Sequence, residues 1–249
     1  MENYTIGENF TLPSLGKVYD KEVNPNIKLR SMTVEEEMKR LSPSERPYKN
    51  LCEIIDDCLV EKPGISTYDM CLGDYQFLLH KLRIVTYGGE YETILMCPYC
   101  GCSNERKVNL EDLEVNQYSD DLSKYLEFDL PKSKDHIKLR MQTPRILDEI
   151  AVRSKDKKKS PGSGESVFLL TIQFLIAEVN GERLGSYEKE KYVRKLHAMD
   201  ANYILKVAEK INDKVGLDTG IEDTCGVCGA DYKSSFRITA EFFGPSIDI

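Results

Sequence analysis

Four cysteines in two matching motifs are the residues of this chain whose types and spacing could do chemistry. Each motif, called a knuckle below, has two cysteines separated by two residues and followed by glycine: Cys97-Pro98-Tyr99-Cys100-Gly101 and Cys225-Gly226-Val227-Cys228-Gly229. In such a turn the second thiolate folds back beside the first, and glycine permits the positive φ that points backbone N–H groups at the sulfurs. Two knuckles supply the four thiolates of a tetrahedral zinc site. The sequence therefore predicts one structural zinc ion per chain, bound by Cys97, Cys100, Cys225 and Cys228.

The distance between the knuckles sets the first structural constraint. About 125 residues separate them, whereas a compact zinc ribbon has roughly 15–20. A long insertion must therefore leave the first knuckle and return to the second.

The other four cysteines have different contexts. Cys52, Cys58 and Cys71 lie in helix-like apolar patterns, where a free cysteine behaves as a small buried hydrophobe. Cys102 follows the first knuckle by two residues, and its sequence context allows an unligated thiol or a substitute ligand. No secretory signal is visible, so we expect a reducing compartment, in which paired cysteines are better explained by metal than by disulfides.

A redox interpretation of the first knuckle is the main chemical alternative. Cys-Pro-Tyr-Cys is also the motif of glutaredoxins, where the first thiolate lies at a helix N-terminus. Here residues 90–96 and 105–110 have strand-like patterns on either side of the knuckle. Strand, knuckle and strand form a zinc-ribbon hairpin, and residues 231–239 predict a strand after the second knuckle. A thiol oxidoreductase using Cys97 and Cys100 is the less favoured hypothesis.

The elements before the first knuckle must position this hairpin. Pro13, Gly16 and Pro25 predict that the first 25 or so residues form an extended arm. A strand over residues 27–32 then leads to a capping box of Thr33 and Glu36, which begins a short helix. Further helices are expected over residues 48–60 and from a cap at Asp74, and we expect these two to pack together and on the hairpin.

The segment between the knuckles predicts a hairpin followed by helices. Residues 124–130 and 136–141 alternate as two strands. Helices are expected from Pro144 to about Ser154 and over residues 166–179, 188–199 and 200–215, the last capped by Asp200. A basic loop over residues 155–164 is expected to be a solvated linker or a contact for nucleic acid or an acidic partner.

Together these patterns predict an α+β protein whose zinc-ribbon β-hairpins are closed by two distant knuckles around a largely helical insertion. The predicted parts are an N-terminal arm with a short strand and helix (residues 1–45), a helical and zinc-ribbon domain (46–114 plus 216–249) and an inserted hairpin-plus-helices region (115–215).

Composition excludes several functional classes. The 249 residues carry a formal net charge of -8, which disfavours non-specific nucleic-acid binding. The longest apolar run is about 11 residues, against the ~20 needed to cross a bilayer, so no membrane segment is expected. His80, His136 and His197 are scattered, and no catalytic motif is present. We therefore expect no enzymatic activity and no small-molecule substrate.

The order of local motifs resembles the T4-type baseplate hub family of contractile-tailed bacteriophages. The matching segments are Leu12-Pro-Ser-Leu-Gly-Lys-Val-Tyr19, Ile27-Lys-Leu-Arg-Ser-Met-Thr-Val-Glu-Glu36, Gly73-Asp74, Leu82-Arg-Ile-Val-Thr-Tyr-Gly-Gly-Glu-Tyr91, the first knuckle and Phe242-Phe-Gly-Pro245. The family tends to carry an aromatic residue where this chain has Gly244. Residues 115–215 do not align by eye.

This resemblance implies a structural or assembly component of a phage tail baseplate, in the virion and in the host cytoplasm during assembly. Its partners would be other baseplate, hub or tail proteins. The N-terminal arm and the apolar tail Phe242–Ile249 would then bind neighbouring subunits, or else pack as terminal strands on the same chain. A zinc-ribbon regulator that binds nucleic acid or a polymerase is the alternative function.

Overall fold

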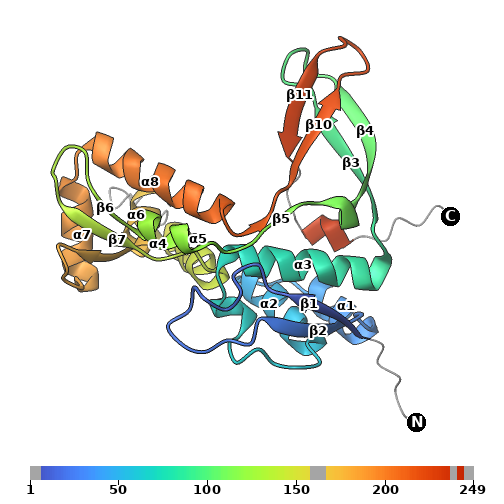
Figure 1. Cartoon of the computed structure of the whole chain (residues 1–249), viewed down its shortest axis with the longest axis horizontal. Helices are drawn as coiled ribbons and strands as arrows, with labels where there is room; N and C mark the ends of the chain where they lie inside the picture. The colour runs from blue at the N-terminus through green and yellow to red at the C-terminus, as the bar shows by residue number, and fades with distance from the viewer. Residues whose placement is uncertain (1–6, 158–166, 236–239, 244–249) are drawn as a thin grey trace.

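The computed structural model describes residues 7–157, 167–235 and 240–243, which form two helical lobes and a projecting four-stranded ribbon (Figure 1). In Figure 1 the long helix α3 lies between the first lobe and the ribbon, and the second lobe extends to one side. The mixture of helices and small antiparallel sheets agrees with the predicted α+β class.

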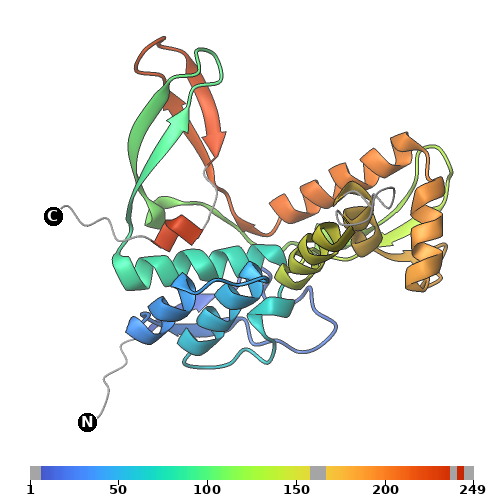
Figure 2. The same ribbon diagram turned by 180° about the vertical axis from the view of Figure 1, so that it is seen from behind.

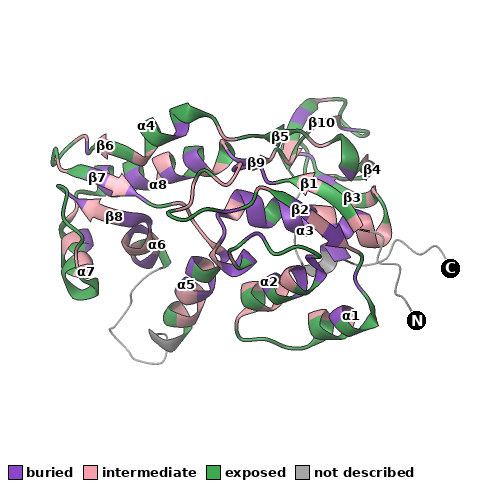
Figure 3. Ribbon diagram, turned by 60° about the horizontal axis from the view of Figure 1, so that its bottom comes forward, coloured by how far each residue is buried: buried purple, intermediate pink, exposed green. Residues whose placement is uncertain are grey.

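The N-terminal lobe surrounds helix α3. Its elements are β1 (Gly7–Thr11), β2 (Asn26–Arg30), α1 (Val34–Leu41), α2 (Pro47–Cys58), η1 (Thr67–Asp69) and α3 (Leu72–Tyr87). Strands β1 and β2 pair antiparallel, and apolar residues of β2, α2 and α3 share one core. Figure 3 shows the resulting pattern, in which α3 is largely buried and α1 largely exposed.

The predicted capping box begins helix α1. The Thr33 hydroxyl accepts from the Glu35 N–H, and the Glu36 carboxylate accepts from the Thr33 N–H at 2.7 Å. Arg30 donates to the same carboxylate at 2.8 Å, and together with Thr33 it lowers the pKa of Glu36 to about 2. The prediction for this helix start is confirmed.

The prediction of an extended N-terminal arm is wrong for residues 7–25, because this segment packs on its own chain. The side chains of Leu12 and Val23 are buried in the lobe's core, and the Leu12 N–H donates to the Pro25 carbonyl at 2.8 Å. Gly16, at φ 72°, closes the turn so tightly that an added Cβ would lie 2.4 Å from the Val23 carbonyl oxygen. The prolines and glycine thus shape a packed turn.

Asp74 and Asp200, which the sequence predicts as helix caps, instead bind distant loops. Helix α3 begins after Cys71, and Asp74 lies in its first turn, buried, where it accepts from the Ser14 N–H at 2.9 Å and the Tyr19 hydroxyl at 2.6 Å. Helix α8 begins after His197, and Asp200 accepts from the N–H groups of a loop at residues 132–133. Both carboxylates still lie near a helix N-terminus, where negative charge is stabilised.

The second lobe, called the insertion lobe, is built on a three-stranded sheet. Its elements are β5 (Val115–Asn116), η3 (Asp120–Leu122), α4 (Ser123–Leu126), β6 (Glu127–Asp129), β7 (His136–Leu139), α5 (Pro144–Lys157), α6 (Val167–Leu175), β8 (Ile176–Val179), α7 (Ser186–Lys195), α8 (Ala198–Asp213) and β9 (Gly216–Leu217). The strand order is β6-β7-β8, and β9 returns to pair with β5.

Two predictions in this lobe need correction. The helix expected over residues 166–179 ends at Leu175, and Ile176–Val179 pairs with β7 as strand β8. The β-branched residues of this strand favour pairing, and Asn180 and Gly181 turn the chain at φ 51° and 82°. The first strand of the predicted hairpin is also shorter, because residues 123–126 form the helical turn α4.

The ribbon consists of two antiparallel hairpins. Strands β3 (Glu90–Met96) and β4 (Ser103–Asn109) flank the first knuckle, and β10 (Gly220–Thr224) and β11 (Asp231–Ser235) flank the second. Figure 2 shows from behind that the ribbon rises from the end of α3 and stands clear of the helices. Its base contacts the core of the N-terminal lobe through Tyr91 and Ile221.

Arg83 fixes the base of the ribbon to α3. This buried guanidinium donates to the carbonyls of Phe242 at 3.0 Å, Gly88 at 2.9 Å and Glu90 at 3.4 Å. The Phe242 and Phe243 side chains, in the short helix η4 (Ala240–Phe243), are buried against the N-terminal lobe. The described part of the C-terminal tail therefore packs on its own chain, while residues 244–249 lie outside the described residues.

Arg83→Met should lower the free energy of unfolding by about 3 kcal/mol, because three carbonyls lose a charged donor in a buried site. Gln76→Met, on an exposed position of the same helix, is the matched control and should change it by less than ~0.5 kcal/mol. Denaturant unfolding followed by circular dichroism measures both. Equal effects of the two substitutions would contradict the assigned role of Arg83.

Candidate metal centre

The two knuckles lie at the tip of the ribbon and form the same turn. In the first, the Gly101 N–H donates to the Cys97 carbonyl at 2.9 Å; in the second, the Gly229 N–H donates to the Cys225 carbonyl at 2.9 Å. Gly101 and Gly229 adopt φ values of 73° and 69°, the left-handed region that favours glycine. The conformation expected from the glycine in each motif is present in both.

The structure brings all four knuckle sulfurs to one place. Cys97 Sγ lies 3.7 Å from Cys228 Sγ, and Cys100 Sγ lies 3.6 Å from Cys225 Sγ. All four sulfurs lie within 4.8 Å of one another. With zinc–sulfur bonds of about 2.3 Å, a tetrahedral site has sulfur–sulfur edges of about 3.8 Å. The donor set therefore has the composition and spacing to hold a metal ion.

The turn prepares one sulfur for the thiolate state. The backbone N–H groups of Cys228 and Val227 point at Cys225 Sγ, at 3.5 and 3.4 Å. These bonds and one from the Cys102 thiol lower the pKa of Cys225 to about 5. By contrast, a hydrogen bond with Cys102 raises the pKa of Cys100 to about 11. A divalent cation would favour the thiolate form of every ligand, because metal binding displaces the thiol protons.

A polar network joins the two hairpins beneath the sulfurs. The buried Asn104 amide accepts from the Gly226 N–H at 3.0 Å and donates to the Tyr232 hydroxyl at 3.2 Å. Tyr232 donates in turn to Asp223, whose other carboxylate oxygen accepts from Arg106 at 2.8 Å. Asn104 of the first hairpin therefore holds the second knuckle, and the Tyr232–Asp223–Arg106 bonds join the two hairpins below it.

Sequence reasoning did not identify this network. Asn104 alternates with exposed positions of β4 and faces inward, so a polar residue at an inward strand position was the available signal. For Tyr232 the sequence indicates only that it lies in the strand expected over residues 231–239. Nothing in the local pattern around Asp223 or Arg106 indicated that they would pair across the ribbon.

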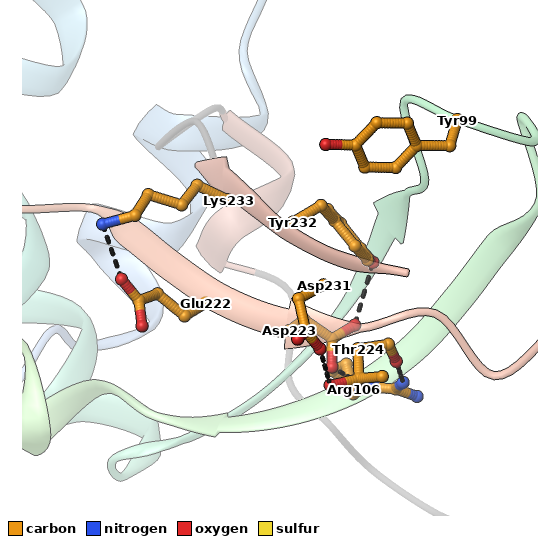
Figure 4. A pocket seen from close by; sticks show the side chains of 8 residues that line it. All are labelled: Tyr99, Arg106, Glu222, Asp223, Thr224, Asp231, Tyr232 and Lys233. Carbon is orange, nitrogen blue, oxygen red and sulfur yellow. Dashed lines mark hydrogen bonds and ion pairs between the residues drawn. The ribbon is translucent and has the colours of Figure 1, made fainter. Parts of the chain in front are cut away.

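An open hollow of about 810 Å³ lies along the β10–β11 hairpin, and Tyr99 and Arg106 of the first hairpin also line it (Figure 4). The charges along it are largely paired with one another, as Lys233 with Glu222 at 2.5 Å and Arg106 with Asp223 at 2.8 Å. In Figure 4 Tyr99 stands across from these residues, on the first knuckle. Since these charges neutralise one another, the hollow has the character of a solvated surface.

The surroundings of Cys97 and Cys100 do not match a thiol-oxidoreductase site. The chain passes from β3 through the turn into β4, so a strand follows the first thiol where a glutaredoxin-type motif has a helix. The histidines are dispersed: His80 lies in α3, His136 lies in β7, and His197 immediately precedes α8. Burial lowers the pKa of His80 to about 4 and keeps it neutral.

The remaining predicted residues are placed as follows. Cys52, Cys58 and Cys71 are buried in the helical cores, which confirms their prediction as small hydrophobes. Burial raises the pKa of each of these thiols. Most of the basic loop at 155–164 lies outside the described residues.

Comparison with protein families gives the class of the protein. A family model described as "T4 bacteriophage base plate protein" matches residues 4–244, nearly the whole chain. The chain belongs to this family. No curated protein and no solved structure matches it. The predicted resemblance to T4-type baseplate proteins is confirmed, and membership implies a structural place in the phage tail among other baseplate proteins.

None of the helices in the described residues of this baseplate protein has the length and apolar character to cross a membrane.

Gly229→Ala should destabilise the ribbon by about 1–2 kcal/mol, because alanine pays a steric cost at positive φ. Gly226→Ala is the matched control in the same knuckle, since its added Cβ would meet only Asn104 Oδ1 at an ordinary 3.6 Å. The free energy of unfolding of each variant measures the difference. A loss at Gly226 as large as that at Gly229 would show that left-handed geometry is not what the second knuckle requires.

Proposed function

We propose that this baseplate protein is a structural or assembly component of the hub or wedge region, acting through protein contacts made by a zinc-closed ribbon. The observation that carries the proposal is the meeting of four cysteine sulfurs from two distant segments of this chain, which belongs to a family of baseplate proteins. We assign zinc as the metal, because four thiolates in a tetrahedral set are typical of structural zinc.

The ribbon's small apolar core supports a structural role for the metal. Among the residues that the structure describes, the buried side chains of the ribbon tip form a cluster of four: Leu95, Cys97, Cys225 and Tyr232. Two-stranded hairpins are marginal in water, and so small a cluster buries little apolar area. Metal binding would supply the missing folding free energy, as in other small zinc modules. On this proposal, residues 46–114 and 216–249 form one domain because the zinc joins them.

The exposed surface of the ribbon supports a role in protein contacts. Ile94 and Met96 of β3 are 63% and 65% exposed, and the knuckle residues Tyr99 and Val227 are 71% and 76% exposed. Exposed apolar and aromatic side chains on a projecting element are typical anchors of protein interfaces. The partners would be other baseplate, hub or tail proteins, in the virion and in the host cell during assembly.

Elemental analysis of the purified protein should find one zinc per chain. Cys225→Ser should lower the zinc content to near zero and unfold the ribbon, because metal binding and ribbon folding are coupled. Cys58→Ala, a buried cysteine outside the cluster, is the control and should keep its zinc. If Cys225→Ser leaves both zinc content and thermal stability unchanged, the proposal that both knuckles of one chain bind the same zinc ion is wrong.

The double variant Tyr99→Ala/Val227→Ser should bind zinc normally but recover far less of the other baseplate proteins in a pull-down from infected cells. Loss of an aromatic anchor costs about 2 kcal/mol or more, roughly 30-fold in affinity. Val34→Ser, at a position of α1 that is 76% exposed, is the control away from the ribbon. Unchanged capture by the double variant would contradict a contact through the ribbon tip.

A further inference from the structure

A fifth cysteine lies beside the four knuckle sulfurs. Cys102 Sγ is 3.0 Å from Cys100 Sγ and 3.1 Å from Cys225 Sγ. It belongs to the loop that leads into β4, and its carbonyl accepts from the Cys97 N–H at 2.9 Å. The backbone of Cys102 is therefore fixed by the same turn that forms the first knuckle.

We propose that Cys102 is a reserve ligand of the metal centre, which takes the place of Cys100 when that sulfur is lost. This inference rests on the zinc site proposed above. Four residues separate Cys97 from Cys102, and zinc sites commonly pair cysteines separated by two to four residues. Cys97 can thus pair with Cys100 or with Cys102, with the second knuckle unchanged.

The exposure of the two sulfurs indicates why a reserve would act at this position. Cys100 is exposed, Cys102 is half-buried and Cys97 is buried. Of the two candidate partners of Cys97, Cys100 is therefore the more open to alkylating or oxidising reagents whenever the metal is absent, and Cys102 is partly shielded. Because Cys102 Sγ already contacts one other ligand, Cys225, rotation about its χ1 between staggered rotamers is the movement that the exchange requires.

Only four of the five thiols bind at a time. The sulfurs that all lie within 4.8 Å of one another are those of the two knuckles, so Cys102 stands outside the primary set. A tetrahedral zinc ion has no fifth position in a structural site. With the primary set bound, Cys102 stays outside the coordination sphere, beside Cys225.

The test compares full-length variants by zinc content and by labelling of the folded protein with iodoacetamide, with the labelled cysteines located by tandem mass spectrometry. In the zinc-loaded wild type, Cys102 should be labelled and the four knuckle cysteines protected. Cys100→Ser should keep one zinc per chain, and Cys102 should become protected. Cys97→Ser and Cys100→Ser/Cys102→Ser should lower zinc affinity by more than the roughly 10–100-fold typical of losing an outer partner.

Three buried cysteines serve as internal controls for folding. Cys52, Cys58 and Cys71 should stay unlabelled in every variant whose helical cores are intact. If Cys100→Ser loses zinc as completely as Cys97→Ser, labels these three, or leaves Cys102 as reactive as in the wild type, the reserve-ligand proposal is wrong while the zinc site stands. A wild type that binds no zinc overturns both proposals.

Discussion

The meeting of two cysteine pairs at the tip of the ribbon is the constraint on which the rest of the arrangement depends. Cys100 and Cys225 are 125 residues apart in the chain, yet their sulfurs lie 3.6 Å apart. Closing so long a loop costs conformational entropy, although this cost grows only slowly with length. The small cluster beneath the sulfurs offers little apolar burial in return, and on the proposal above a bound metal supplies the stabilisation.

Buried polar groups hold the other distant segments together. Asp148 in α5 accepts from the N–H groups of Tyr48 and Lys49, and so caps the N-terminus of α2, which has no side-chain cap of its own. Asp74 binds the turn at Ser14, and Arg83 joins α3 to the ribbon base and to the C-terminal helix η4. An unpaired buried donor or acceptor is costly, so these bonds also specify which segments can meet. These bonds thus fix the position of α3, from whose end the ribbon rises.

Features set by local residue chemistry could be predicted from the sequence. The glycine after each knuckle, the Thr33–Glu36 capping box and the strands around the first knuckle depend on neighbours within a few positions. The missed features depend on partners far along the chain. Strand β8 forms because β7 lies beside it, and Asp74 and Asp200 serve loops about 60 and 68 residues away. The Asn104–Tyr232 contact likewise could not be predicted from the sequence, because nothing in the sequence of either strand indicates that the two strands lie side by side.

On the proposal above, this baseplate protein carries a projecting ribbon that a metal ion closes and that contacts other baseplate proteins. The central claim of that proposal is that one zinc ion is bound by sulfur from both knuckles of the same chain. Zinc X-ray absorption spectroscopy of the monomeric protein tests this most directly. The account predicts four sulfur neighbours at about 2.3 Å and no nitrogen or oxygen ligand. A spectrum with nitrogen or oxygen in the first shell, or with fewer than four sulfurs, would contradict it.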